Sequence, residues 1–525
     1  MTLSRARIPA LAFAAAVASA VGGSLFAQSA RWRPEDRVLV SDFSEVGALA
    51  TDDRLIYVGS SAGIGVFDVS FDRWLDPITA EDGYPVAADP TALAFDIVSN
   101  ELWLATVDGR LFSYSPFFGR WRDEGLAASP PVFDIVFSDE PGRPVFLRES
   151  SGWSVLERGS FTAQSLPRGV SPPLLGSAAA DPMSDPLIRA RGRTLTIDEV
   201  GRSWPVTDAV SLLGSPDVWI GTYGGHLFRY SDFASEPAHY VYGVPSRGVS
   251  TLLVSDDAIW FGGDAGSRRQ GVARADHDLD RWLQWEGRVH GAPRGRVREL
   301  AEVEGRLWAG AEDGLYVLEA DGRWSRAGAR LPDDRVLAVL PAPGGAWVGT
   351  RRGAVFVDAD GETTSGGIAP GVRVAGLAAY RGDLWLATDA GVLRAVGAAR
   401  TGASTTLVRL GDSDPRWGAV ARSVVATETA VYAAFDRAVR RVDRAGEPDP
   451  PLGPGGREAR LRVADGRVWL AGVDGARAWD PDTGELIEFE VGPDIPAGPV
   501  RDVGVGAGGV WLATPLGALL LRRGW

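Results

Sequence analysis

A short motif that returns along almost the whole chain constrains the fold more than any other feature. It reads aromatic, apolar, two small residues, a turn, and then Gly six positions after the aromatic, as in 102–109 and 218–225. The aromatic anchors are Tyr57, Trp103, Trp219, Trp260, Trp308, Trp347, Trp385, Tyr432, Trp469 and Trp511, with weaker copies at Phe146 and near Leu187. They recur about every 41 residues, which is the length of a four-stranded propeller blade. The sequence therefore predicts an all-β β-propeller with about twelve four-stranded blades.

Each repeat divides into four strand-like pieces, which we name A to D. Residues 335–340, 346–350 and 354–358 form one such series, with a poorer fourth piece after Gly361. The anchor lies on strand B, where a large flat ring fills the wedge between neighbouring blades. The small residue two positions later lets the next sheet approach closely, and the Gly at six closes the B–C turn, where a positive φ is expected.

The two ends of the chain predict how the propeller closes. The last repeat ends at 519–525, where its strand D should begin, whereas residues 31–42 look like a spare strand D ahead of the first strand A at Val46. We expect this strand to complete the last blade and to remove an unpaired edge. Because single rings usually hold about four to eight blades, we expect two packed propellers. The predicted domains are 28–244, with blades 1–5 and the closing strand, and 245–525, with blades 6–12. Six-plus-six, five-plus-seven and nested rings stay open.

The N-terminus and the composition indicate the compartment. Arg5 and Arg7 precede an apolar stretch from Ile8 to Val21 and then small residues, which is typical of a secretory signal peptide over residues 1–27. Cleavage is expected after Ala27, with Ala20 as second choice and an uncleaved N-terminal anchor as the alternative. The sequence has no Cys, so disulfides and thiolate metal sites are excluded. Its net charge of −14 argues against a nucleic-acid partner, and no later stretch suits a membrane helix. We expect a periplasmic or secreted protein.

The strand-B motif, together with the loops 328–336, 244–249 and 495–500, resembles the two-component regulator propeller repeat of bacterial sensors. The resemblance covers nearly the whole mature chain, although blades 3, 4 and 10 depart from it. It implies an extracytoplasmic ligand-sensing propeller, often one that recognises glycans, followed by a membrane helix and a kinase. Neither follow-on element is expected here, so sensing would pass through a separate signalling or assembly partner.

Propellers usually bind at the central opening on the face made by the B–C turns and the D–A loops. The residues four and five positions past each anchor lie there and predict a largely acidic rim with one doubly basic blade. The candidate ligand-binding residues are Asp108, Tyr223, Asp264, Glu312, Asp313, Arg351, Arg352, Asp389 and Asp474. Because Asp is also common in turns for local hydrogen-bonding reasons, a purely structural role is the alternative for each of them.

No catalytic residue, metal site or cofactor is predicted. The four histidines, His226, His239, His277 and His290, lack the close spacing of metal ligands, and no nucleophile elbow or phosphate-binding loop occurs. The prediction is a non-catalytic binding or sensor protein that recognises a glycan, a peptide or an envelope protein through loops on the ring face. The alternatives are a propeller enzyme of lyase or glycosidase type without a linear motif, and a scaffold in an envelope or secretion complex.

Overall fold

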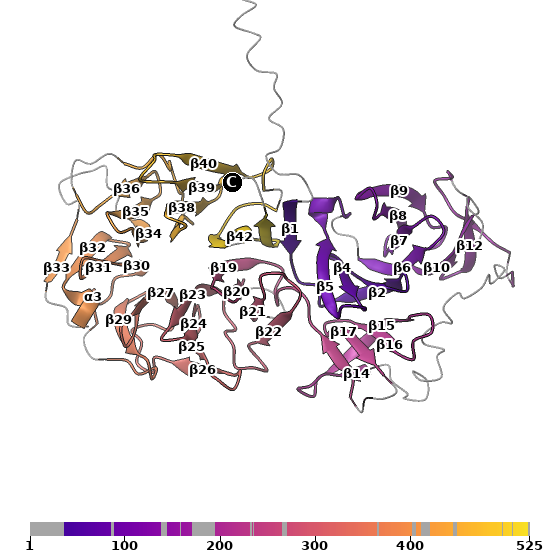
Figure 1. Ribbon diagram of the computed structural model, residues 1–525, viewed down its shortest axis with the longest axis horizontal. Coiled ribbons are helices and arrows are strands. Elements are labelled where there is room, and N and C mark those ends of the chain that lie inside the picture. Colours follow the sequence, from indigo (N-terminus) through magenta and orange to yellow (C-terminus); the bar gives the residue numbers. More distant parts are fainter. Residues whose placement is uncertain are drawn as a thin grey trace, which may run out of the picture.

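The structure is a computed structural model. It describes residues 36–522 apart from 86–88, 138–143, 158, 168, 171–194, 232–233, 235, 265–269, 365–366, 402–405, 411–419, 445–448, 496 and 507. The predicted signal peptide, its cleavage site and the degenerate copy near Leu187 lie outside these residues. The described part is all-β, with antiparallel sheets of mostly four strands arranged as two rings side by side (Figure 1). The predicted fold class, an all-β propeller, is confirmed.

The N-terminal ring is built from four sheets among the described residues. Their strands are β2 (Val46–Thr51), β3 (Leu55–Ser60), β4 (Gly63–Asp68) and β5 (Arg73–Ile78); β6 (Pro90–Asp96), β7 (Glu101–Thr106), β8 (Arg110–Ser115) and β9 (Arg120–Leu126); β10 (Val132–Val136), β11 (Val145–Glu149), β12 (Gly152–Leu156) and β13 (Gln164–Ser165); and β14 (Leu195–Ile197), β15 (Ser203–Ser211), β16 (Val218–Thr222), β17 (His226–Tyr230) and β18 (Ala238–Tyr240). The inner strands β10, β6, β2 and β15 contact one another in that order. A short 3-10 helix, η2 (Ala80–Asp82), follows β5.

The C-terminal ring follows directly, and its strands are β19 (Val249–Val254), β20 (Ile259–Gly263), β21 (Gly271–Ala275) and β22 (Trp282–Glu286); β23 (Val297–Val303), β24 (Arg306–Ala311), β25 (Gly314–Leu318) and β26 (Trp324–Ala327); β27 (Val336–Ala342), β28 (Gly345–Thr350) and β29 (Gly353–Asp358); β30 (Val374–Tyr380), β31 (Asp383–Thr388), β32 (Gly391–Val396) and β33 (Thr406–Arg409); β34 (Ala421–Ala426), β35 (Val431–Phe435) and β36 (Val439–Arg441); β37 (Arg460–Ala464), β38 (Arg467–Gly472), β39 (Gly475–Trp479) and β40 (Leu486–Glu490); and β41 (Asp502–Gly506), β42 (Gly509–Thr514) and β43 (Gly517–Leu521). A single helical turn, α3 (Ala398–Thr401), follows β32. The innermost strands contact one another in a closed cycle from β19 through β23, β27, β30, β34 and β37 to β41 and back to β19.

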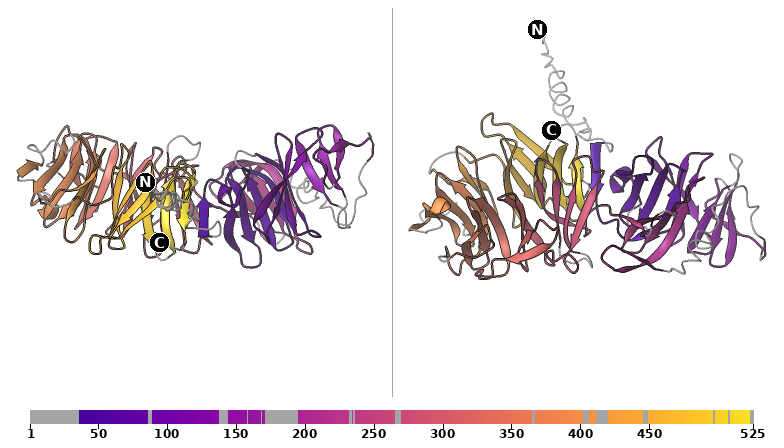
Figure 2. Two further views of the ribbon diagram at one scale, coloured as in Figure 1. Left: turned by 90° about the horizontal axis from the view of Figure 1, so that it is seen from above. Right: turned by 60° about the horizontal axis from the view of Figure 1, so that its bottom comes forward.

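The closing strand lies where the two ends of the chain predict it. Strand β1 (Arg37–Val40) pairs antiparallel with β43, and the Cα partners run from Arg37 with Leu521 to Val40 with Ala518. It lies between the two rings, beside the end of the chain (Figures 1 and 2). The last sheet of the C-terminal ring therefore takes its outer strand from the other end of the sequence. The count of twelve blades and the domain boundary at residue 244 stay predictions.

The repeat motif performs the packing expected of it. The rings of Trp103, Trp219, Trp308, Trp347, Trp469 and Trp511 are among the largest fully buried side chains. Two residues after Trp308, a Cβ on Gly310 would lie 2.6 Å from Cγ1 of Val336, the first residue of the next inner strand. Gly at that position is what allows neighbouring sheets to touch. Among the described residues, no helix is long and apolar enough to span a membrane.

Candidate functional site

The predicted ring-face residues all lie in B–C turns, but they divide between the two rings. Asp108 follows β7 and Tyr223 follows β16, both in the N-terminal ring. The others belong to the C-terminal ring and follow β20, β24, β28, β31 and β38; they are Asp264, Glu312, Asp313, Arg351, Arg352, Asp389 and Asp474. The nine residues therefore do not form one site, and the seven of the C-terminal ring lie in the B–C turns of five different sheets.

Two of the predicted acids form ion pairs with arginines that begin the inner strands. Asp264 pairs with Arg296 and, at 2.6 Å, with Nη1 of Arg501. Glu312 accepts hydrogen bonds from Arg298, whose Nε lies 3.1 Å from Oε1. The rim is acidic in sequence, but its carboxylates turn sideways to these arginines. Of these pairs, Arg296, Arg298 and Arg501 line the space inside, whereas Asp264 and Glu312 do not.

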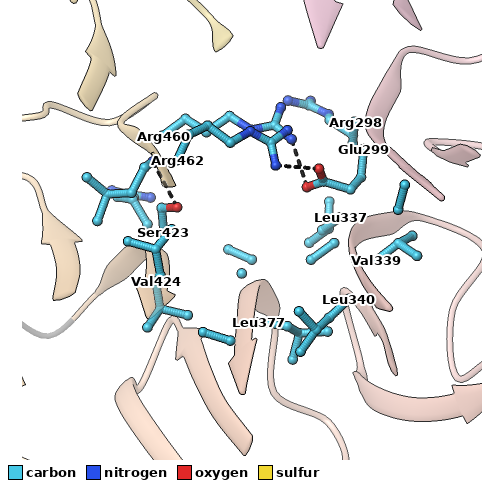
Figure 3. Close-up of a pocket in the computed structure, with 18 of the residues that line it drawn as sticks. Arg298, Glu299, Leu337, Val339, Leu340, Leu377, Ser423, Val424, Arg460 and Arg462 are labelled. Carbon is cyan, nitrogen blue, oxygen red and sulfur yellow. Dashed lines mark hydrogen bonds and ion pairs between the residues drawn. The ribbon is translucent and has the colours of Figure 1, made fainter. Parts of the chain in front are cut away.

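That space is a cavity of about 800 Å³ in the C-terminal ring. Its wall comes from the inner strands β19, β23, β27, β30, β34 and β37, which present their side chains to it. In the view of Figure 3, Arg298 and Glu299 lie at the upper right of the cavity, Ser423 and Val424 at the left, Leu337 and Val339 at the right, and Leu340 and Leu377 at the bottom. A volume of this size suits a ligand of several hundred daltons, since small-molecule sites usually measure about 300–1,000 Å³.

A salt-bridge cluster forms one wall of this cavity. Arg460 and Arg462 of β37 reach across to Glu299 of β23, each with a nitrogen 2.7 Å from a carboxylate oxygen (Figure 3). Arg462 also pairs with Asp502 at 2.8 Å, and the Thr251 hydroxyl donates to Asp502 at 2.7 Å. These side chains satisfy one another, so the cluster fixes the wall.

Electrostatics keep the buried carboxyl of this cluster ionised. Burial alone would raise the pKa of Asp502, but Arg460, Arg462 and the Thr251 hydroxyl together lower it to about 2. Burial would likewise lower the pKa of Arg462, whereas Asp502 and Glu299 raise it. A carboxylate held in this way suits a structural ion pair better than a proton donor.

The remaining arginines stand at the mouth of the cavity. Arg373, directly before β30, and Arg422, the second residue of β34, both line it. Arg422 pairs with Asp436, with 2.7 Å from Nε to Oδ1. Arg373 makes no ion pair within the described residues, and burial together with the charges of Arg422, Arg298 and Arg351 lowers its pKa, against the opposing effect of Asp389. Of the predicted residues, Arg351 and Asp389 lie near enough to Arg373 for their charges to shift its pKa.

The lining arginines are functional candidates that sequence reasoning missed. A signal for them exists, because a basic residue recurs where strand A begins, as in Arg296-Val297, Arg335-Val336 and Arg373-Val374. The predicted binding residues all lie in the turns after strand B. The start of strand A lies on the same face but nearer the axis.

His239 and His226 are held by contacts with neighbouring side chains. His239 stacks on Phe228 with ring centroids 4.3 Å apart, and its Nδ1 lies 2.7 Å from Glu199. Nε2 of His226 lies 3.3 Å from the Gln284 side chain, which joins the two rings. Within the part of the chain that the structure describes, no three His, Asp or Glu side chains gather as metal ligands.

No family model matches the chain, and no curated protein matches its sequence. Among solved structures, it is similar to the extracellular domain of a B. thetaiotaomicron protein described as a hybrid two-component system, with a TM-score of 0.41, 12% identity, and coverage of 91% of this chain and 69% of that one. It is similar to PorZ, a surface component of the type-IX secretion system of Porphyromonas gingivalis, with a TM-score of 0.42, 13% identity, and coverage of 91% and 74%. It is also similar to virginiamycin B lyase from Staphylococcus aureus, with a TM-score of 0.41, 12% identity, and coverage of 52% and 95%. Extracellular domains of two-component systems are thus among the structures that this chain resembles.

Proposed function

We propose that this chain is a non-catalytic extracytoplasmic binding or sensor propeller whose ligand enters the central cavity of the C-terminal ring. The observation that carries the proposal is the cavity of about 800 Å³, whose lining combines aliphatic side chains with several guanidinium groups. Mostly apolar pockets with a few directed polar groups are the usual form of ligand sites. The ligand is a glycan, a peptide or a segment of an envelope protein, and the N-terminal sequence pattern supports an extracytoplasmic location.

Within this proposal the two rings have different tasks. The segment 245–525 forms the ligand-binding ring, and Arg351 and Asp389 belong to its rim. The segment 28–244 supplies the closing strand and a second ring whose faces are free for a signalling or assembly partner. The carboxyl groups with raised pKa, Glu81, Asp82 and Asp280, lie outside the cavity lining.

The test fills the cavity without changing its charge. Ala375, the second residue of β30, lines the cavity and is half-buried, so Ala375→Phe projects a ring into it. Thr91 is the second residue of β6 and has the same register in the N-terminal ring, which makes Thr91→Phe the matched control. A thermal-shift screen of residues 28–525 against envelope glycans and oligopeptides identifies a ligand, because binding to the native state raises the melting temperature.

We expect Ala375→Phe to weaken binding of that ligand at least tenfold, about 1.4 kcal/mol, and Thr91→Phe to leave it unchanged. Isothermal titration calorimetry measures both. Equal affinities in all three proteins would place the ligand elsewhere and reject the cavity as the site.

A further inference from the structure

Arg373 differs in its surroundings from the other half-buried arginines that line the cavity. Arg298 has Glu312, Arg422 has Asp436, and Arg460 and Arg462 share Glu299 and Asp502. Arg373 is half-buried at the cavity mouth, and no carboxylate of the described residues lies at ion-pair distance from it. A half-buried guanidinium without a counter-ion is unfavourable in the empty protein.

The neighbours of Arg373 increase this unfavourable charge. Arg422 and Arg298 come from inner strands on either side of it, and Arg351 from the B–C turn between β28 and β29. Their positive charges act on Arg373 together, opposed by the charge of Asp389. Several guanidinium groups that converge on one opening create a positive potential, which an anion would satisfy.

Part of the cavity wall is aliphatic. Leu337, Leu340, Leu377 and Val424 face it, and its described lining contains no aromatic ring (Figure 3). Sugar rings are usually held by stacking on flat aromatic faces, whereas branched aliphatic side chains pack well against Leu and Val. The wall therefore suits the side chain of a residue such as leucine better than it suits a pyranose.

We propose that the cavity binds the free C-terminal carboxylate of a peptide through Arg373, assisted by Arg422 and Arg298, with the last aliphatic side chain packed against Leu337, Leu340 and Leu377. The proposal rests on the function proposed above and names its ligand class. Arg is suited to this task because its planar group donates two parallel hydrogen bonds to one carboxylate.

The probe is N-acetyl-leucyl-leucine, compared with its C-terminal amide and with glucuronate. The acid and the amide have the same shape and differ only in charge, and glucuronate presents the same carboxylate on a sugar. We expect the acid to bind at least tenfold more tightly than either of the others, and its affinity to fall as salt rises. Calorimetry of residues 28–525 measures the three affinities. Equal affinity for acid and amide, tighter binding of glucuronate, or no binding of the acid would overturn the proposal.

Two variants tie the preference to Arg373. Arg373→Gln is expected to abolish the difference between acid and amide. Arg335→Gln is the matched control, because Arg335 stands directly before β27, just as Arg373 stands before β30, but is exposed and does not line the cavity. It should retain the full preference. If both variants behave alike, the anion site is wrong.

A measurement without ligand checks that the variant is folded and tests the same electrostatic argument. Because Arg373 is half-buried beside three like charges, Arg373→Gln is expected to keep or raise the melting temperature of the empty protein. A clear fall would show that Arg373 serves the fold and would contradict a ligand role. If neutral glycans bind and Ala375→Phe blocks them while the acid does not bind, the cavity is the site but its ligand is not a peptide carboxylate.

Discussion

Asp82 carries the clearest pH effect at the scale of single residues. It lies at the end of η2, close to β1, and accepts a hydrogen bond of 2.9 Å from the backbone N–H of Thr79. Burial raises the pKa of its carboxyl to about 6, and Asp76 adds to the increase against the effect of the Thr79 hydrogen bond. In the folded protein, protons therefore bind more tightly to Asp82 than they do in the unfolded chain.

The raised pKa of Asp82 gives a prediction for Asp82→Asn. The wild-type carboxyl favours folding below about pH 4 and opposes it increasingly as the pH rises through about 6. Asn keeps the acceptor for Thr79 but carries no charge, so at pH 7 the variant should be more stable by about 1–2 kcal/mol. Urea unfolding at pH 4 and pH 7 tests this; a variant that is less stable at pH 7 would show that the charge itself is needed.

Sequence patterns predicted the packing residues that recur in every repeat, but not the cavity residues that occur only once. Trp308 and Gly310 have packing roles that recur in the blades: an aromatic ring fills the wedge between sheets, and a small residue lies where the sheets touch. Because the same requirement recurs in each blade, the same residue types recur along the sequence. Arg373 belongs to no such repeat, because its electrostatic surroundings depend on which charged residues the other blades place near the ring axis. The pairing of Glu312 with Arg298 was equally invisible, since any of the acids in the turns looks the same before the ring is closed.

At the scale of elements, the pairing of β1 with β43 depends on one glycine. Gly517, the first residue of β43, has φ of 142°, and a Cβ there would lie 2.1 Å from the carbonyl oxygen of Val40 in β1. Neither the backbone conformation nor the space admits a side chain. The closing strand can therefore approach only because this position is glycine.

We expect Gly517→Ala to destabilise the protein by more than about 2 kcal/mol and to expose β1. Hydrogen exchange of residues 37–40, followed by mass spectrometry, reports the strand directly. Gly466→Ala is the control, since Gly466 has φ of 71° but nothing lies within 4 Å of its Cβ position. Gly466→Ala should introduce backbone strain without speeding hydrogen exchange in β1. Faster exchange of residues 37–40 in both variants would mean that the contact with Val40 is not the cause.

At the scale of the whole molecule, the two rings share one hydrophobic cluster. It joins Trp74 and Trp219 of the N-terminal ring to Trp282 and Trp511 of the C-terminal ring. Tyr242 lies between them, with ring centroids 4.5 Å from Trp74 and 5.5 Å from Trp282. Arg522 adds an ion pair of 2.7 Å to Asp76 across the same junction. Because the apolar contact is continuous, the rings should unfold together.

Differential scanning calorimetry should therefore show one transition for the wild type and two for Tyr242→Ala. The loss of a buried aromatic ring costs about 3–5 kcal/mol of stability. Because Tyr242 lies at the junction, this loss weakens the contact between the two rings. Tyr380→Ala is the control, because Tyr380 is buried within the C-terminal ring, in the cluster around β30 and β34. It should lower the melting temperature without splitting the transition; two transitions in the wild type would show that the rings are independent.

The place of β1 also sets an order of events while the chain is made. Residues 37–40 are made long before their partners at 518–521, and the strands of both rings lie between them in the sequence. A chain that ends before residue 518 leaves both β1 and β42 with an unpaired edge. The outer strand of the last sheet can therefore take its place only after both rings have been made.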